Sequence, residues 1–281
     1  MRINTEWRDY EILATGNGEK LERWKDIILL RPDPQVIWDK SCDISKYKIN
    51  AKYIRDSSGG GRWEKLLPLP EEWTVSWRNL NFKVKPMGFK HTGLFPEQAV
   101  NWAMMIDLIK SAIRPISVLN LFAYTGGATL ACLSAGANVC HVDAAVNMNE
   151  RAKDNLRLSK LDITKARFIA DDCLKFVTRE IKRGKKYDAV IMDPPSYGRG
   201  PSGEMWKIED NLFSLVKTTT KVLSDNPLFY LINSYTTGLQ PQVLNNILTL
   251  SLKGKKVESY EVGLPTKEGI VLPCGSSAIW S

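Results

Sequence analysis

The chain has 281 residues, of which 43% are hydrophobic and 25% are charged, a composition typical of a globular protein with a full hydrophobic core. This length favours one large domain, or a main domain with an accessory, and the composition excludes a miniature scaffold and a disordered chain. The 39 basic and 31 acidic residues leave a formal net charge of +8, which raises the expectation of a polyanionic partner without showing one.

The five cysteines are odd in number and form no C-x-x-C pair, so neither a disulfide framework nor a zinc site is indicated. The two histidines, His91 and His141, stand apart from acidic clusters, so no metal centre is expected. The N-terminus lacks the apolar core of a signal peptide, and no run of roughly 20 apolar residues is present to span a membrane. We therefore expect a cytoplasmic protein that binds neither metal nor membrane, and the sequence does not indicate an oligomeric state.

Residues 1–90 differ in composition from the rest of the chain. Six of the nine tryptophans fall there, between short strand-like runs such as 26–30 and 81–85. We predict that residues 1–90 form a small β-rich accessory domain. Its tryptophans are expected to fill the core, with stacking on nucleobases as the alternative.

Strands and helices alternate through the rest of the chain. The predicted strands are 116–122, 138–143, 167–170, 188–192, 228–233, 257–262 and 271–280, with helices between the first six. This alternation favours a parallel sheet covered on both faces. Only about eight residues join the last two strands, fewer than a parallel crossover needs, so the seventh strand is expected to run antiparallel. Residues 91–281 are thus predicted to form an α/β domain with the Rossmann-like arrangement of a class I methyltransferase.

A glycine turn follows the first predicted strand of this domain. Residues 120–129 lead from the strand through Gly126 and Gly127 into a helix, where small residues let backbone approach a ligand near free N–H groups. The two adjacent glycines are not the G-x-G-x-x-G pattern, which disfavours an NAD-dependent oxidoreductase. Taken alone, the turn is equally compatible with an ordinary tight connection.

Acidic residues end the second and third predicted strands. Asp143 stands about 17 residues after Gly126, where a carboxylate can accept hydrogen bonds from both ribose hydroxyls of an adenosine-containing cofactor. Capping of the next helix is the alternative. Of Asp171 and Asp172, one can face an adenine while the other caps a helix, and we favour Asp172 for the adenine side.

The fourth predicted strand ends in Asp193, Pro194 and Pro195, followed by Ser196 and Tyr197. Two prolines fix φ and remove two N–H donors, so the Asp193 side chain and the Pro194 carbonyl are held at the sheet edge where ligands bind. We predict that Asp193, Pro194, Pro195 and Tyr197 form the catalytic group. Asp193 and the Pro194 carbonyl would accept hydrogen bonds from an exocyclic amine, and Tyr197 would stack on the base, with ordinary packing as its alternative.

These motifs resemble those of S-adenosylmethionine-dependent methyltransferases, specifically the bacterial rRNA large-subunit methyltransferase group, over about residues 80–281. The segment 90–98 (KHTGLFPEQ) is similar to a K-T-G-aromatic-x-x-D-Q-R segment of that group, with Glu97 and Ala99 in place of its Asp and Arg. The resemblance implies S-adenosyl-L-methionine as cofactor and RNA, such as rRNA, as substrate. It also implies the following cofactor-binding residues: Phe95, Gln98, Asn120, Phe122, Tyr124, Thr125, Gly126, Asp143, Ala144, Asp172 and Asp193.

The resemblance departs from the group at a cysteine. Members that methylate cytosine C5 use a cysteine thiolate after the fifth strand, because C5 is otherwise a poor nucleophile. This chain has residues 233–236 (NSYT) there, and Cys274 in the final hairpin is the remaining candidate, with a hydrophobic packing role as its alternative. Without a thiolate, the acceptor is expected to be a heteroatom with its own lone pair. Two rival functions stay open: methylation of a small molecule or protein, and RNA binding by a degenerate, non-catalytic pocket.

Overall fold

The computed structural model describes residues 1–40, 42–56, 60–88, 90–199 and 205–281. Its chain forms two compact units. One, called here the α/β unit, comprises Met1–Arg2, Val100–Val262 and Cys274–Ser281, and the other, the β unit, comprises Ile3–Ala99 and Gly263–Pro273. This division differs from the predicted one after residue 90, because the tip of the last β-hairpin belongs with the N-terminal strands.

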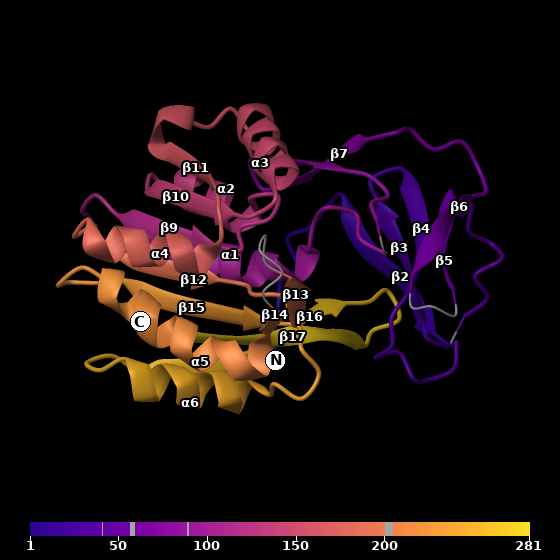
Figure 1. Ribbon diagram of the computed structural model, residues 1–281. Helices are drawn as coiled ribbons and strands as arrows, with labels where there is room; N and C mark the ends of the chain where they lie inside the picture. Colours follow the sequence, from indigo (N-terminus) through magenta and orange to yellow (C-terminus); the bar gives the residue numbers. More distant parts are fainter. Residues whose placement is uncertain (41, 57–59, 89, 200–204) are drawn as a thin grey trace. The chain divides into compact units, whose positions relative to one another are not determined.

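The large sheet has the strand order β1-β16-β17-β15-β12-β9-β10-β11 (Figure 1). These strands are β1 (Arg2–Ile3), β9 (Ser117–Leu121), β10 (Asn138–Asp143), β11 (Ala166–Ala170), β12 (Ala189–Met192), β15 (Phe229–Ser234), β16 (Val257–Pro265) and β17 (Val271–Trp280). The pairs β9–β10, β10–β11, β9–β12 and β12–β15 are parallel, whereas β17 runs antiparallel to β15. The predicted seven-stranded, mostly parallel sheet with an antiparallel last strand is confirmed, and β1 adds a short eighth strand.

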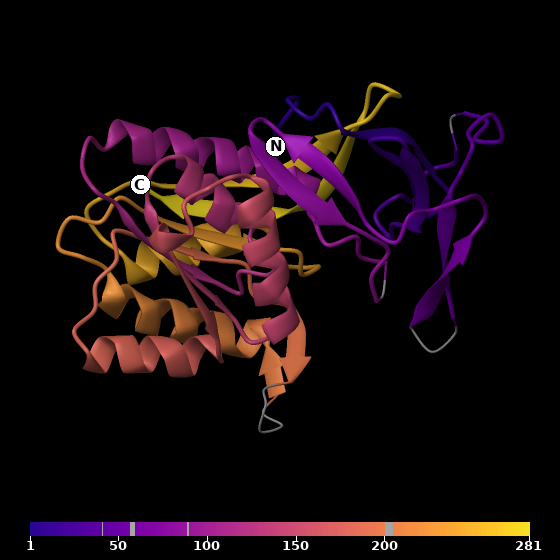
Figure 2. The same cartoon turned by 90° about the horizontal axis from the view of Figure 1, so that it is seen from above.

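Helices cover both faces of this sheet. They are α1 (Ala99–Ser111), α2 (Gly127–Ser134), α3 (Val146–Leu158), α4 (Cys173–Lys182), α5 (Ile208–Thr219) and α6 (Pro241–Ser251). Figure 2 shows α1 and α2 on one face and α4 and α5 on the other, and α5 also packs against α6. Every residue of β12 and β15 is buried, as expected for strands covered from both sides. None of the helices in the described ranges has the length and apolar character needed to cross a membrane.

The β unit is built from two smaller sheets. A five-stranded sheet contains β2 (Tyr10–Gly16), β3 (Glu19–Trp24), β4 (Ile27–Pro32), β5 (Ala51–Arg55) and β6 (Gly61–Lys65), and a hairpin contains β7 (Trp73–Trp77) and β8 (Leu80–Val84). Trp24 and Trp77 are fully buried, in line with the expected core-filling role of the tryptophans. The predicted small β-rich region is therefore confirmed.

A buried ion pair joins β3 to β4 inside the β unit. Arg31 donates from Nε to Glu22 Oε2 at 2.5 Å and from Nη2 to Glu22 Oε1 at 2.7 Å. The Tyr10 hydroxyl donates to the same carboxylate at 2.7 Å. Arg31 also donates to the backbone carbonyl of Lys90 at 2.8 Å, and the Lys90 ammonium donates to the Pro32 carbonyl at 3.0 Å. The lysine that begins the family-like segment thus has a structural role.

Candidate functional site

The turn between β9 and α2 has an unusual backbone. Phe122, Tyr124 and Gly126 have positive φ angles of 54°, 50° and 89°. Residues other than glycine are uncommon in this left-handed region, and holding one there costs about 1–3 kcal/mol. Strained backbone is therefore concentrated in the segment that the sequence singles out, and such strain clusters at ligand-binding sites.

Asp143, at the end of β10, fixes this turn from the neighbouring strand. Its Oδ2 accepts a hydrogen bond from the Tyr124 N–H at 2.8 Å, and its Oδ1 accepts one from the Ala145 N–H at 2.9 Å. Burial raises the pKa of Asp143, and these two hydrogen bonds oppose the rise. Because each carboxylate oxygen can accept two hydrogen bonds, the group has the capacity for two ribose hydroxyls as well. The N-cap of α3 is Ala145, so capping does not explain Asp143.

The register of three neighbouring strands brings the predicted site residues to one edge of the sheet. Leu121 in β9 pairs with Val142 in β10 and with Met192 in β12. The next residue along each strand is Phe122, Asp143 or Asp193, so Phe122 lies between the two acids. This is the carboxyl edge of a parallel sheet, where open α/β folds bind ligands.

The paired glycines of the turn allow close packing between helices. A Cβ on Gly126 would lie 2.9 Å from Ala152 Cβ in α3, and a Cβ on Gly127 would lie 2.5 Å from Trp102 Cζ2 in α1. Both distances are shorter than ordinary contact. Of the two interpretations that the sequence left open, the tight connection is thus supported, since the glycines let the start of α2 lie against α3 and α1. A ligand at this turn stays a prediction.

Gly127→Ala is expected to lower the free energy of unfolding by about 1–3 kcal/mol, because the added methyl group overpacks the buried Trp102 ring. Gly88→Ala is the matched control, since a Cβ there would meet no atom within 4 Å. Thermal unfolding followed by circular dichroism measures both. Equal melting temperatures for the two variants would contradict this packing role.

Asn120 lies in a buried polar network below the turn. Its Nδ2 donates to Thr129 Oγ1 at 2.9 Å, and that hydroxyl is 2.9 Å from His141 Nδ1. Burial lowers the pKa of His141 to about 3, so the ring is neutral at physiological pH. The Asn120 side chain therefore ties β9 to α2 and β10, and its predicted cofactor contact stays a prediction.

Of the two acids after β11, Asp172 takes the helix-capping role. Asp172 is the N-cap of α4 and accepts a hydrogen bond from the Lys175 N–H at 2.8 Å. Asp171 forms an ion pair with Arg179 and accepts a hydrogen bond from the Asp172 N–H at 2.8 Å. Capping satisfies a free N–H group of the first helical turn and uses one oxygen of Asp172, and the adenine contact of Asp172 stays a prediction.

The turn after β12 is held in place by a hairpin of β13 (Tyr197–Arg199) and β14 (Met205–Lys207). The Trp206 indole N–H donates to the Pro195 carbonyl at 2.6 Å. The Ser196 hydroxyl is 2.6 Å from that of Thr236, which follows β15. Pro194 is buried and Asp193 partly buried, so the predicted acceptor groups lie on a turn braced from two sides.

Trp206 is a site residue that the sequence reasoning missed. Its ring centroid lies 5.7 Å from that of Phe122, with the rings tilted by 46°. Together with the bond to Pro195, this contact places an aromatic surface beside both the strained turn and the turn of residues 193–195, the D-P-P motif. One signal was available: Trp206 is one of three tryptophans outside the first third of the chain, and it follows the D-P-P motif closely.

Tyr197 lies on the outer part of the same hairpin. Its side chain is 53% exposed, and its hydroxyl donates to Met205 Sδ at 2.5 Å. Such exposure argues against a core-packing role. Stacking by Tyr197 stays a prediction.

Three of the cysteines are inert core residues. Burial raises the pKa of Cys132, Cys140 and Cys173, that of Cys140 to about 11, so all three are neutral thiols at physiological pH. Cys274 is only partly buried. It stands in β17 two residues before Ser276, which pairs with Ser234 at the end of β15, so Cys274 lies just past the carboxyl end of β15.

The remaining predicted cofactor residues fall in different settings. Thr125 is buried and its carbonyl accepts a hydrogen bond from Asn155 Nδ2 at 2.9 Å, whereas Ala144 is exposed beside Asp143. Phe95 and Gln98 belong to the β unit, where Pro96–Gln98 forms a 3-10 turn before α1. Their predicted roles stay predictions. Within the described part of the chain, no group of three or more His, Cys, Asp or Glu side chains is arranged to hold a metal ion.

Comparison with curated proteins finds relatives named for rRNA methylation. Ribosomal RNA large subunit methyltransferase I of Tolumonas auensis is 36% identical over 130 residues, which is 46% of this chain and 32% of the relative. The protein of that name from Enterobacter sp. is 30% identical over 162 residues, which is 57% of this chain and 38% of the relative. The matches thus span about a third of the relatives' length.

Two further comparisons cover most of the chain. The crystal structure of a SAM-dependent methyltransferase from Agrobacterium tumefaciens superposes with a TM-score of 0.93 at 32% identity, covering 99% of this chain and 92% of that one. The family model for S-adenosylmethionine-dependent methyltransferases matches residues 36–227. The Asp143 carboxylate at the carboxyl edge of the sheet has acceptor capacity for two ribose hydroxyls, which agrees with this match. The chain belongs to the S-adenosylmethionine-dependent methyltransferase family.

Proposed function

We propose that this protein transfers a methyl group from S-adenosyl-L-methionine to a base of rRNA or of another structured RNA. The observation that carries the proposal is the alignment of Asp143, Phe122 and Asp193 on adjacent strands, with the Trp206 ring against Phe122. The Asp143 carboxylate, suited to a sugar, and the rigid turn at Asp193, suited to a base, thus lie on either side of Phe122. The names of the relatives and the net charge of +8 support RNA as the substrate.

On the cofactor side, Asp143 would accept hydrogen bonds from the two ribose hydroxyls, while its bonds to the Tyr124 and Ala145 N–H groups keep the carboxylate in place. When bound, the cofactor supplies an electrophilic methyl group on a sulfonium. The backbone of residues 122–126 is already folded for this purpose, so little ordering is required on binding.

On the acceptor side, Asp193 and the Pro194 carbonyl accept hydrogen bonds from an exocyclic amine of the base, and Trp206 offers its ring for stacking. We propose this amine nitrogen as the acceptor. Its lone pair would attack the methyl carbon with the sulfur as leaving group, and Asp193 or water would then take the proton from the nitrogen. Alignment supplies most of the catalysis in such a transfer. Residues 234–236 (SYT), at and after the end of β15, contain no thiol for attack on a base carbon.

Labelling tests this function. The purified protein is incubated with isotopically methyl-labelled S-adenosyl-L-methionine and total rRNA from cells that lack it, and the RNA is digested to nucleosides for mass spectrometry. We expect the label in a base-methylated nucleoside with the methyl on nitrogen. Label only in protein or small molecules would contradict RNA as substrate, and label in 5-methylcytidine that Cys274→Ser abolishes would contradict the nitrogen acceptor.

Trp206→Ala is expected to lower kcat/KM for RNA about 5- to 100-fold, because stacking of a base on an aromatic side chain contributes about 1–3 kcal/mol. Trp206→Phe keeps a ring and should retain most of the activity. The affinity for S-adenosyl-L-methionine and the melting temperature are measured alongside. Equal kcat/KM for the alanine variant and the wild type would remove Trp206 from the acceptor site.

A cytoplasmic location is part of the same proposal. The five cysteines are free, which suits a reducing compartment, and the proposed substrate is found there. The proposed methyl transfer requires no metal ion.

A further inference from the structure

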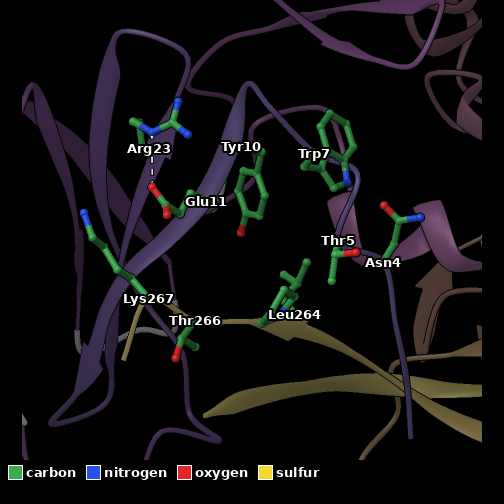
Figure 3. A pocket seen from close by; sticks show the side chains of 10 residues that line it. Asn4, Thr5, Trp7, Tyr10, Glu11, Arg23, Leu264, Thr266 and Lys267 are labelled. Atoms are coloured by element: carbon green, nitrogen blue, oxygen red, sulfur yellow. Dashed lines mark hydrogen bonds and ion pairs between the residues drawn. The ribbon is translucent and has the colours of Figure 1, made fainter. Parts of the chain in front are cut away.

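The β unit contains a pocket of about 200 Å³ (Figure 3). Its lining includes none of the residues of the candidate functional site. Four separate parts of the sequence form its wall. They are Thr5 and Trp7 before β2, Tyr10 and Glu11 in β2, Arg23 in β3, and residues 264–267 at the tip of the β16–β17 hairpin. All of them belong to the same compact unit, so the pocket does not depend on how the two units are arranged.

Two aromatic rings form a rigid part of this wall. The Trp7 indole N–H donates to the Pro96 carbonyl at 2.9 Å, and the Tyr10 hydroxyl donates to Glu22 at 2.7 Å. The two rings meet edge to face, with centroids 6.0 Å apart and planes at 68°. Trp7 is partly exposed and supplies ring surface to the pocket, whereas Tyr10 is only 4% exposed and packs against the Trp7 ring from its buried side. A ligand that stacks on a fixed ring loses little side-chain entropy.

Two cationic residues, Arg23 and Lys267, belong to the lining of the pocket. Arg23 pairs with Glu11 at 3.4 Å and donates to the backbone carbonyls of Arg8 and Lys25. The backbone N–H of Lys267 donates to the Ile12 carbonyl at 2.8 Å, which fixes the residue at the rim while its side chain is exposed. Arg23 and Lys267 together outnumber the one lining carboxylate, Glu11, so the pocket favours a ligand that carries negative charge.

The size of the pocket limits what it holds. Pockets for drug-sized ligands usually enclose about 300–1,000 Å³, whereas this one encloses about 200 Å³. It therefore accepts one planar ring system, with any further groups outside. A flat ring against an aromatic side chain and an anion at a cationic rim together describe one nucleotide.

We propose that this pocket binds a single unpaired nucleotide of the RNA substrate, with the base against Trp7 and the phosphate at Arg23 and Lys267. The inference rests on RNA being the substrate, as proposed above. It assigns to the β unit the recognition of an unpaired position in the RNA that is not the methylated one. Bases that are not paired are the ones whose faces are free to stack on protein rings.

The test uses the full chain and fluorescein-labelled oligouridylate and oligoadenylate, with binding followed by anisotropy over a range of KCl concentrations. Lys267→Glu is expected to weaken binding about tenfold at low salt and to reduce the salt dependence by about one counterion. Lys48→Glu makes the same charge change at an exposed lysine of the β unit that does not line the pocket, and is expected to alter binding less than about twofold. Equal effects of the two variants would overturn the proposal.

A second pair of variants tests the stacking. Trp7→Phe should keep most of the affinity and Trp7→Leu should lose about 5- to 100-fold, with melting temperatures measured to confirm that both variants fold. Equal affinities for these two would also overturn the proposal, as would tighter binding of labelled oligoglutamate than of RNA. Methylation of rRNA is measured in parallel. If the wild type methylates RNA and Lys267→Glu behaves like Lys48→Glu, only the pocket assignment fails; if the wild type does not methylate RNA, the proposed function fails.

Discussion

Asp143→Ala is expected to weaken the binding of S-adenosyl-L-methionine by at least about 100-fold, which corresponds to roughly 3 kcal/mol. The substitution removes the acceptor proposed for both ribose hydroxyls. It also leaves the Tyr124 and Ala145 N–H groups without their bonds of 2.8 and 2.9 Å, so the strained turn loses its support. Asp143→Asn keeps the shape and one acceptor oxygen, and an intermediate loss is expected. Isothermal titration calorimetry with the cofactor measures each effect.

Asp154→Ala is the matched control, because Asp154 is a partly exposed acid on α3 that pairs with Arg157 one turn away. Its affinity for the cofactor should equal that of the wild type.

The pH dependence of cofactor binding provides a second readout. Burial raises the pKa of Asp143, and only the ionised group is a full double acceptor, so affinity should be lost on acidification at a higher pH than an ordinary aspartate would give. An unchanged affinity of Asp143→Ala would remove the ribose assignment.

Glu22→Gln is expected to lower the free energy of unfolding by about 3–5 kcal/mol, because it leaves the buried Arg31 guanidinium without a compensating charge. Urea unfolding at neutral pH measures the loss. Glu19→Gln is the control on the same strand, since Glu19 pairs with Lys40 at a partly exposed position and such pairs contribute about 0–1 kcal/mol. Similar losses for the two variants would contradict the role given to the buried pair.

The same pair predicts how stability depends on pH. Burial alone would raise the pKa of Glu22, but the charges of Arg31 and Lys20 outweigh it and lower the pKa to about 2. Because this value lies below the unfolded pKa of about 4.3, the stabilisation is present above the unfolded pKa and is lost as the pH falls through the folded one. The wild type should therefore lose stability between about pH 5 and pH 2 more steeply than Glu22→Gln. Parallel curves for the two proteins would contradict this assignment.

The fold could be predicted because its signals are local. The strands β9, β12 and β15 are mainly apolar runs, and the short link before β17 leaves only an antiparallel return. Asp143 and Asp193 could be picked out for a related reason: each ends a parallel strand, and all such ends share one edge of the sheet. The division of the chain into units could not be predicted from local signals. The segment Gly263–Pro273 belongs to the same unit as Ile3–Ala99, which ends more than 160 positions earlier in the sequence.

The details of the site depend on side-chain partners that no local pattern reveals. Asp171 and Asp172 both follow a strand and precede a helix, and only the geometry shows that Asp172 makes the cap. Asn120 lies within the apolar run of β9, but its amide donates a hydrogen bond to Thr129 inside the protein. Trp206 comes from a later hairpin and reaches the site through the indole bond to Pro195. Such contacts between distant residues are set by tertiary packing rather than by spacing along the chain.

The most direct measurement is a crystal structure of the protein with S-adenosyl-L-methionine bound. The account predicts that both ribose hydroxyl oxygens lie about 2.6–3.2 Å from the Asp143 carboxylate, next to the backbone of residues 122–126. A cofactor whose ribose is held by other residues, with the Asp143 carboxylate facing solvent, would contradict it.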